Sequence, residues 1–413
     1  MRCLFFYFTL MIYGCTCRGP AVAPMTDAGA CAAQPEVSHA LPKNIVRQEP
    51  TAATPHVHPL ALCEGKGRLP LDAAREAFDA REYEKALSCA AQAAALSPGD
   101  VLAHTERANA LAQLLRNDEA VLAYARALAI DPDSLDALAG AAHFYIVLMP
   151  SSRELDELGS AYAERGFELA TAQHDEPFAL SFARLSAMGF NDTGQPQDAL
   201  DRADWVLHRE KDDPEALYER AVALFELCRF ADAKTAFTRL LADAERAAWA
   251  HHHLALLLER EGKEQEAQVH FGKARALDLQ AFPTPVLLSK EEFQAELDKA
   301  ISQLPADMRK DLKGVPVAME DLPAVLDLTS GDPPLSPNIL GLFRGTPLSE
   351  PCELEPDAKP GSPCRSIALY RKNLARAVKT RDELVEQISV TLLHEVGHLR
   401  GEDDSELAAR GLE

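Results

Sequence analysis

The sequence predicts a mainly α-helical protein in which an α-solenoid is followed by a small α+β domain. Three observations predict this class. Small apolar residues recur with a 34-residue spacing through the middle of the chain, and such a spacing is typical of stacked two-helix repeats. The period ends at the prolines of residues 282–285. Two short strand-like segments and one long amphipathic helix then follow, which indicates a separate domain.

Length, composition and charge limit the possible classes. The chain has 413 residues, of which 47% are hydrophobic and 26% are charged, so we expect two or more folded units and no bulk disorder. Lys and Arg number 42 against 64 for Asp and Glu, for a net charge of −22. This balance predicts no nucleic-acid partner. No glycine-rich phosphate loop follows a predicted strand, so no nucleotide cofactor is expected.

The first residues have the pattern of an export signal. Arg2 precedes an apolar stretch, Cys3–Tyr13, that is too short to span a bilayer. The segment Ile12–Cys15 resembles a bacterial lipoprotein cleavage box, in which Cys15 would be lipidated and would anchor the chain to a membrane. We therefore predict a signal peptide or lipoprotein signal at 1–17 and a bacterial cell-envelope location, periplasmic or outer-membrane. A cytoplasmic protein with a short disordered start is the alternative.

The next two segments differ in composition. Residues 18–60 are rich in Pro and Ala without helical periodicity, which predicts a disordered linker. Residues 61–281 are predicted to form the repeat array. Ala199, Ala233 and Ala267 follow one another at 34-residue intervals. Small residues allow neighbouring helices to approach closely, and aromatic residues such as Phe237 and Phe271 fill the space between them.

One repeat departs from the period. Ala120 and Ala199 are 79 residues apart, 11 more than two periods, so we expect an insertion around 149–163 and 170–177. Over about 210 residues the array resembles the tetratricopeptide repeat family, with five or six repeats. The resemblance implies a concave groove that binds a protein or peptide. The alternative is that the array only spaces or stabilises the next domain.

Three adjacent histidines, His251 to His253, lie in the last predicted repeat. Successive residues of a helix point about 100° apart, so three adjacent imidazoles cannot converge on one ion. We interpret them as part of a helix face without a metal.

The C-terminal domain is predicted to span 285–413. Ser289 and Glu292 form a capping-box pattern at the start of a helix. Residues 314–319 and 366–370 indicate strands, and residues 332–363 between them indicate a loop rich in Pro and Gly. Nine cysteines are too sparse for a disulfide scaffold. Cys352 and Cys364 are expected to form a local disulfide in an exported protein and to be free thiols in a cytosolic one.

The last long helix carries the candidate chemistry. Thr380 and Glu383 form a second capping-box pattern, and the helix contains the sequence H-E-x-x-H from His394 to His398. Because residues i and i+4 share a helix face, both imidazoles can bind one zinc ion. Glu395 lies beside them and is the candidate general base for a zinc-activated water. The stripe that we expect to be buried consists of Leu384, Ile388, Leu392 and Val396.

A third ligand must come from another residue type, because no further histidine follows residue 281. The donors left in this domain are carboxylates and its two cysteines. Gly401 can end the helix and turn the chain back toward the metal. Asp404 is the first candidate, with Asp403 and Glu406 as rivals. The alternative interpretation is a solvated acidic turn that caps a short last helix.

The segment 289–412 resembles the small bacterial zincin-like metallopeptidase family, the minimal zincins. The resemblance lies in the motifs L-P-A-D-M at 304–308, L-G-L-F-R-G at 340–345, I-A-L-Y-R at 367–371 and T-L-L-H-E-V-G-H at 391–398, with Gly401 and Asp404. It implies one Zn²⁺ held by His394, His398 and Asp404, with Glu395 as base. The chain departs from the family at Leu399–Arg400 and in a longer loop around 352–364, which puts the shape of the substrate cleft in question.

Two further residues have open interpretations. Tyr370 is either a strand residue of the core or a phenol that stabilises an oxyanion. Arg344 contacts either substrate or an acidic loop. Together the patterns predict a zinc metallopeptidase whose repeat array binds a protein partner or substrate. The alternative function is a non-catalytic scaffold or adaptor whose metal site is structural or degenerate.

Overall fold

The computed structural model of the protein describes residue 63 and residues 69–352 and 363–412. The predicted signal segment 1–17, including Cys15, and the predicted linker 18–60 lie outside the described residues. Among the helices of the described ranges, none combines the length and hydrophobicity that a membrane span requires.

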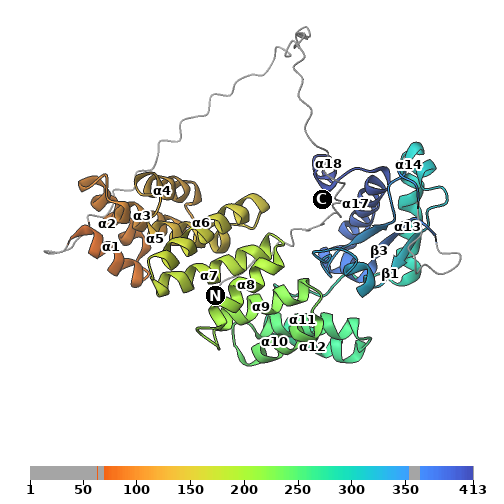
Figure 1. The fold of residues 1–413 in the computed structure, drawn as a ribbon, viewed down its shortest axis with the longest axis horizontal. Helices are drawn as coiled ribbons and strands as arrows, with labels where there is room; N and C mark the ends of the chain where they lie inside the picture. The colour runs from red at the N-terminus through yellow and green to blue at the C-terminus, as the bar shows by residue number, and fades with distance from the viewer. Residues whose placement is uncertain (1–62, 64–68, 353–362, 413) are drawn as a thin grey trace, which may run out of the picture.

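Consecutive helix pairs form the repeat array, which leads from α1 to α12 toward the C-terminal domain (Figure 1). Each helix packs most extensively on its neighbours in the chain, as expected for a solenoid. The helices of the array are α1 (Pro70–Asp79), α2 (Tyr83–Leu96), α3 (Val101–Gln113), α4 (Asn117–Ile130), α5 (Leu135–His143), α6 (Arg153–Ala172), α7 (Glu176–Asp192), α8 (Pro196–Leu207), α9 (Pro214–Glu226), α10 (Phe230–Arg239), α11 (Ala247–Arg260) and α12 (Glu264–Leu277).

The repeating residues lie where the period predicted them. Ala199, Ala233 and Ala267 are each completely buried. Small residues are suited to these positions, because a larger side chain would separate the paired helices. Phe237 is also completely buried, and Phe271 is nearly so. The predicted helical repeat packing is therefore confirmed in the described part of the array.

The irregular repeat absorbs its extra residues by lengthening its helices. Helix α5 continues as a π-helical turn, η1 (Phe144–Leu148), and α6 and α7 reach 20 and 17 residues. The regular helices α3 and α9 have 13 residues each. The insertion predicted around 149–163 therefore falls mainly in α6.

The C-terminal domain combines helices with a three-stranded sheet of order β1-β3-β2. Strand β3 pairs in parallel with β1 and antiparallel with β2, with Ile367 opposite both Val317 and Phe343. The elements are α13 (Lys290–Gln303), α14 (Ala306–Asp311), β1 (Val317–Glu320), α15 (Val325–Leu328), β2 (Gly341–Arg344), β3 (Ser366–Tyr370), α16 (Arg371–Ala377), α17 (Arg381–Arg400) and α18 (Asp404–Ala408).

The strand predictions are partly right. Strand β3 has the predicted bounds, and β1 starts three residues later than the predicted 314. Strand β2 lies inside the segment 332–363 that we interpreted entirely as loop, and this interpretation was wrong. With four residues flanked by Pro- and Gly-rich segments, β2 has too weak a local pattern to be recognised; its pairing with β3 stabilises it.

The two faces of the sheet are covered by different parts of the chain. Ile367 and Leu369 of β3 face the main core, where they pack with residues of α13 and α17. Ala368 and Tyr370 alternate with them and face a smaller core that includes Leu335. Residues of the repeat array pack against this second core, so the array covers part of the second face of the sheet.

The three adjacent histidines of α11 point to different neighbours. His251 contacts His270, with 3.0 Å between their Nδ1 atoms. His252 stacks on Phe282, and His253 stacks on Phe237.

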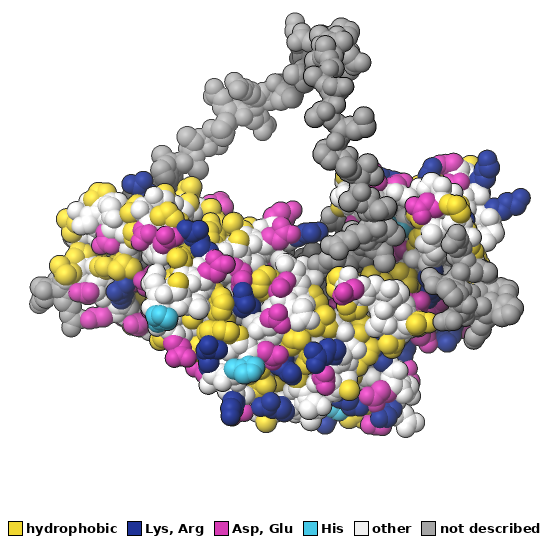
Figure 2. All heavy atoms as spheres, in the orientation of Figure 1, with side chains coloured by type: hydrophobic (Ala, Val, Ile, Leu, Met, Phe, Trp, Pro, Cys, Tyr) yellow, Lys and Arg dark blue, Asp and Glu magenta, His cyan; other side chains and the backbone are white. Residues whose placement is uncertain are grey.

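On the face of the molecule in Figure 2, acidic and basic side chains are interspersed among apolar ones.

Candidate metal centre

Helix α17 orients the candidate site because its two ends and its buried face are fixed. Both halves of the predicted capping box at Thr380 and Glu383 are present. The predicted stripe is completely buried in the main core, which corresponds to about 1.5–3 kcal/mol for each large aliphatic side chain. The buried stripe fixes the rotation of α17, so that His394 and His398 share another face. The members of the stripe are Leu384, Ile388, Leu392 and Val396.

The two imidazoles of α17 face each other. The Nε2 atoms of His394 and His398 are 2.9 Å apart. The Nδ1 atom of His394 lies 2.6 Å from the carbonyl oxygen of Leu412, and that of His398 lies 3.0 Å from the carbonyl oxygen of Glu402. Since a carbonyl oxygen only accepts, both Nδ1 atoms carry the proton and donate it. In the neutral form of each ring the lone pair is therefore on Nε2, the tautomer that a metal ligand requires.

Asp404 completes a group of three candidate ligands. Its Oδ1 atom lies 3.2 Å from Nε2 of His398 and 3.7 Å from Nε2 of His394. Among the described residues, this is the group whose ligand atoms are arranged to hold a metal ion, all within 4.8 Å of one another. The rivals Asp403 and Glu406 lie elsewhere: Asp403 caps α18, and Glu406 is its capping-box partner.

Two glycines permit the return of the chain that brings Asp404 to the histidines. Gly401 ends α17 with φ of 94°, in the left-handed region. Gly397 lies between His394 and His398, where Leu407 of α18 contacts α17. A Cβ atom at Gly397 would lie 2.3 Å from Cδ2 of Leu407, so a larger residue would push α18, and Asp404 with it, away from the site.

The electrostatic environment differs between the two rings. Burial lowers the pKa of His394, and the neighbouring His398 lowers it further. Burial also opposes the charged form of His398, but its pKa is raised, because Asp404, Glu395 and the Glu402 carbonyl outweigh burial. The side chain of His394 is 3% exposed, whereas those of His398 and Asp404 are 19% and 35% exposed. The group is therefore open to solvent on one side.

The donor set fits a divalent metal ion. Two imidazole lone pairs and one carboxylate oxygen face one another across short distances, an arrangement that is repulsive unless a proton or a metal cation lies among them. Two nitrogen donors with one carboxylate are a typical set of protein ligands for catalytic zinc. His394, His398 and Asp404 are therefore the residues that would hold the ion.

Glu395 lies on the inner side of this group, against strand β2. It is 2% exposed, and its carboxylate accepts a hydrogen bond from the backbone N–H of Phe343. Burial raises the pKa of Glu395 to about 7. A Cβ atom at Gly341 would lie 2.6 Å from Oε1 of Glu395. The absence of a side chain at Gly341 is thus what lets β2 pass so close to the carboxylate.

Arg344 and Tyr370 lie on the strands behind this carboxylate. Arg344 donates to both Glu320 oxygens at 3.0 and 3.1 Å and to both Asp327 oxygens at 3.1 and 2.7 Å. It is thus engaged by acidic side chains of its own domain. Tyr370 is completely buried, with its hydroxyl 3.5 Å from the Arg344 guanidinium. Burial raises the pKa of Tyr370, and the nearby Glu395 charge adds to this effect.

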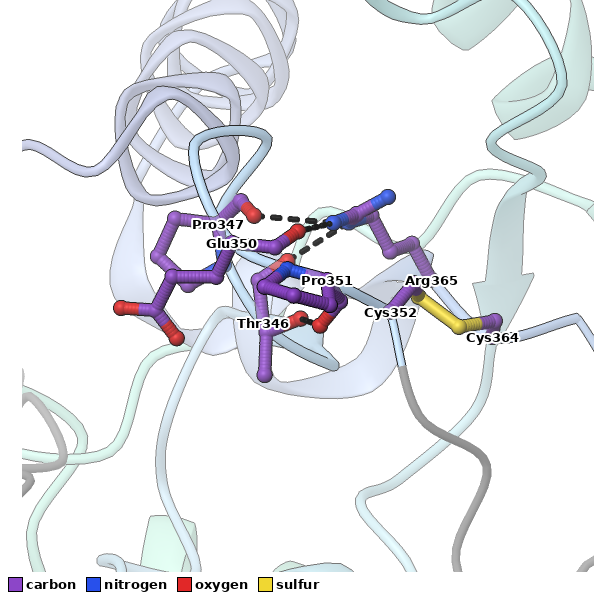
Figure 3. Close-up of a disulfide and its surroundings, with 7 residues drawn as sticks. All are labelled: Thr346, Pro347, Glu350, Pro351, Cys352, Cys364 and Arg365. Carbon is purple, nitrogen blue, oxygen red and sulfur yellow. Dashed lines mark hydrogen bonds between the residues drawn. A yellow bond between two sulfur atoms is a disulfide. The ribbon is translucent and has the colours of Figure 1, made fainter.

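The segment just before the Cys352–Cys364 disulfide contacts the end of α17. Cys352 and Cys364 form the bond left open by the sequence, and the guanidinium of Arg365 beside it donates to the carbonyls of Thr346, Pro347 and Glu350 (Figure 3). The contact with α17 is made by Leu348, whose N–H donates to the Leu399 carbonyl at 2.8 Å.

Several contributors to the site were not found from the sequence. The carbonyls of Leu412 and Glu402 fix the ring tautomers, yet a backbone acceptor has no sequence signal. The contact of Gly341 and Phe343 with Glu395 depends on the unrecognised strand β2. A second disulfide, Cys63–Cys89, joins the start of the described chain to α2. Of the five described cysteines, Cys228 is free.

Comparison with known proteins divides the chain in the same way. Residues 312–412 match the zincin-like metallopeptidase family. Residues 71–134 and 187–233 match the tetratricopeptide repeat family. No curated protein matches the chain significantly.

Among solved structures, the chain is similar to the type IV pilus biogenesis factor PilW, with 21% identity and a TM-score of 0.42 over 50% of this chain and 91% of that one. It is also similar to PilF of Pseudomonas aeruginosa, with 15% identity and a TM-score of 0.43 over 55% and 96%. The tetratricopeptide protein YrrB, described as having an unusual peptide-binding site, has 17% identity and a TM-score of 0.37 over 46% and 93%.

Proposed function

We propose that this chain, which contains tetratricopeptide repeats within residues 71–233 and a zincin-like metallopeptidase domain at residues 312–412, is a zinc-dependent peptidase. His394, His398 and Asp404 would hold one zinc ion, and Glu395 would act as general base. The observation that carries this proposal is the convergence of two Nε2 lone pairs and one carboxylate oxygen beside a buried glutamate.

The donor set favours a catalytic metal over a structural one. Structural zinc sites usually have four protein ligands, whereas catalytic sites have three and leave a position for water. Zinc held in this way lowers the pKa of water and polarises a peptide carbonyl. The side on which His398 and Asp404 are exposed is the side that a substrate would approach.

Glu395 has the properties that a general base requires. With a pKa of about 7, its carboxylate can take a proton from water at neutral pH and return it to the leaving amine. The Phe343 N–H holds the carboxylate in place. The carbonyl acceptors of Leu412 and Glu402 orient the rings of His394 and His398, which supports their role as ligands through Nε2.

The direct test is metal content together with hydrolysis in the full chain. Purified protein should contain one zinc per chain and cleave a denatured protein such as casein, and a chelator should remove both properties. His394→Ala should lose zinc and activity. His208→Ala, at an exposed histidine after α8, should retain both. Hydrolysis by zinc-free His394→Ala at the wild-type rate would contradict the proposal.

We also propose that the protein acts in the bacterial cell envelope and that its repeat array binds a protein or peptide. Two disulfides among the described cysteines support an oxidising compartment. Lipidation at Cys15 is tested by labelling cells with a fatty acid and comparing wild type with Cys15→Ser. Unlabelled wild-type protein in the cytoplasmic fraction would contradict the envelope location.

A further inference from the structure

The repeat array and the catalytic domain meet along the segment that leads into strand β2. Residues 335–340 lie between the end of the array and the sheet. On the array side, Arg260 at the end of α11 donates to the carbonyl oxygens of Pro337, at 2.7 Å, and Pro323, at 3.1 Å. Asn338 donates to Glu226 at the end of α9, at 3.2 Å. The array thus contacts this segment through two of its helices.

The catalytic domain holds the same segment from its other side. Asn373 of α16 donates to the carbonyls of Pro337 and Ile339 at 3.0 and 2.8 Å. The N–H of Tyr370 donates to the carbonyl of Leu340 at 2.8 Å. Pro337 is therefore shared, with its carbonyl oxygen accepting from both Arg260 and Asn373. Four residues further on, Gly341 begins the strand that touches Glu395.

A buried ion cluster fixes the array against α16. Glu259, adjacent to Arg260, has a side chain that is 3% exposed, and it pairs with Lys372 at 3.2 Å and also with Arg376. Lys372 additionally pairs with Glu264 of α12. Because removing one partner of a buried pair leaves an uncompensated charge, such clusters resist separation. Helix α16 follows β3 without a break and carries Asn373.

We propose that Arg260 of the repeat array is a positioning residue for the peptidase reaction: it holds the segment before β2 and thereby sets the distance of that strand from Glu395. The guanidinium suits this role because its planar fork donates to two carbonyls at once. Strand β2 has four residues and lies at the edge of the sheet, where, among the described strands, it pairs with β3 alone. The last repeats therefore belong to the catalytic unit, as well as offering a binding surface.

The inference rests on the proposed function for its activity readout, so the experiment includes a second readout that does not need activity. Full-length wild type, Arg260→Ala, Arg260→Lys and Asn338→Ala are compared. Arg239→Ala is the matched control, since Arg239 is exposed on α10 and pairs with Asp212 of the array. The measurements are zinc content, kcat and KM for a short peptide, and amide hydrogen exchange of residues 335–344 and of α17.

In Arg260→Ala we expect kcat to fall roughly ten- to a hundredfold, the scale of a misplaced catalytic group, with KM within about twofold and zinc content unchanged. Amides of 335–344 should exchange faster while those of α17 stay protected. Arg260→Lys should keep the charge but recover only part of kcat, because an ammonium does not reproduce the fork. Asn338→Ala should act in the same direction, and Arg239→Ala should behave as wild type.

Two results would overturn the inference. One is an unchanged kcat in Arg260→Ala, whether or not the exchange of 335–344 changes. The other is a loss of zinc and of α17 protection together with kcat, which would indicate general destabilisation. If wild type itself hydrolyses nothing, the proposed function fails, and the exchange of 335–344 still decides whether Arg260 holds the segment.

Discussion

Two buried glutamates, one in each part of the molecule, have a similarly raised pKa but different surroundings. Glu219 of α9 in the array is 4% exposed, and Glu395 of α17 is 2% exposed. Burial raises the pKa of each to about 7. Around Glu219 lie the Asn191 amide and further acids, since Glu219 itself raises the pKa of Asp192. Around Glu395 lie the Phe343 N–H, His398 and Asp404.

The comparison shows that a raised pKa does not identify a catalytic carboxylate. Burial is the largest cause of the shift in both regions, because the charged form loses hydration wherever it is enclosed. The difference between the two glutamates is that Glu395 lies next to a group of candidate metal ligands. Glu395 interacts with His398 and Asp404, two of the three candidate metal ligands, whereas Glu219 has Asn191, Glu215 and Arg246 around it and, among the described residues, no such group.

The largest expected effect separates the two glutamates by activity. Glu395→Gln should reduce kcat/KM for a protein substrate by roughly 10²–10⁴-fold while zinc content is unchanged, because the amide cannot accept the proton. Glu219→Gln should leave kcat/KM near wild type. Equal activity of Glu395→Gln and wild type would show that Glu395 is not the general base. Glu395 and Glu219 would then not differ in function.

The next effect concerns stability and pH at Glu219. Because its folded pKa of about 7 exceeds the ordinary value, the folded state keeps a proton that the unfolded state has lost between about pH 4.5 and 7. Raising the pH through this window should therefore cost up to about 3 kcal/mol of unfolding free energy. Urea unfolding at several pH values should show this loss in wild type and a smaller one in Glu219→Gln.

Glu168→Gln, at an exposed position of α6, is the control for that measurement. It should follow the wild-type pH dependence throughout. If Glu219→Gln also follows it, the carboxyl group of Glu219 does not titrate differently in the folded state, and the similarity between the two glutamates is lost.

A third test separates the acidic neighbours. Asp404→Asn should weaken zinc binding by at least roughly tenfold. A loss of this size is typical even for residues that only hydrogen-bond to a metal ligand. Asp403→Asn should have nearly no effect, because Asn caps a helix about as well as Asp. In the array, Asp192→Asn should leave zinc affinity unchanged. Zinc titration with a competing chelator measures the zinc affinity of all three variants. A larger loss of affinity in Asp403→Asn than in Asp404→Asn would make Asp403 the ligand instead of Asp404.

The smallest effect concerns two helical glycines. Gly397→Ala should destabilise the protein by about 1–3 kcal/mol, because the new methyl group overlaps Leu407. Gly272→Ala on α12, where nothing lies within 4 Å of the added atom, should stabilise it by about 0.5–1 kcal/mol. Thermal unfolding of both variants is the measurement, and a stabilising Gly397→Ala would show that α18 is not seated closely on α17.

Local sequence patterns anticipated much of the fold. The 34-residue spacing placed Ala233 and Phe237 in the core of the array, because solenoid contacts join neighbouring elements. Both capping boxes and the four-residue stripe of α17 follow from helical geometry alone. Strand β2 escaped prediction because its stability comes from antiparallel pairing with β3, a strand that begins only after the long segment that follows β2. In this pairing Gly341 lies opposite Leu369, and Arg344 lies opposite Ser366.

The sequence by itself determined that the imidazoles of His394 and His398 and the carboxylate of Glu395 lie about one helical turn from one another, since that follows from 3.6 residues per turn. It left three acidic residues as candidates for the third ligand. Only the tertiary structure gives their positions: Asp403 caps α18 with Glu406 as its capping-box partner, and Oδ1 of Asp404 lies 3.2 Å from Nε2 of His398. Tertiary structure likewise decided that Arg260 of the repeats reaches Pro337 before β2, since a contact across 77 residues has no trace in local periodicity.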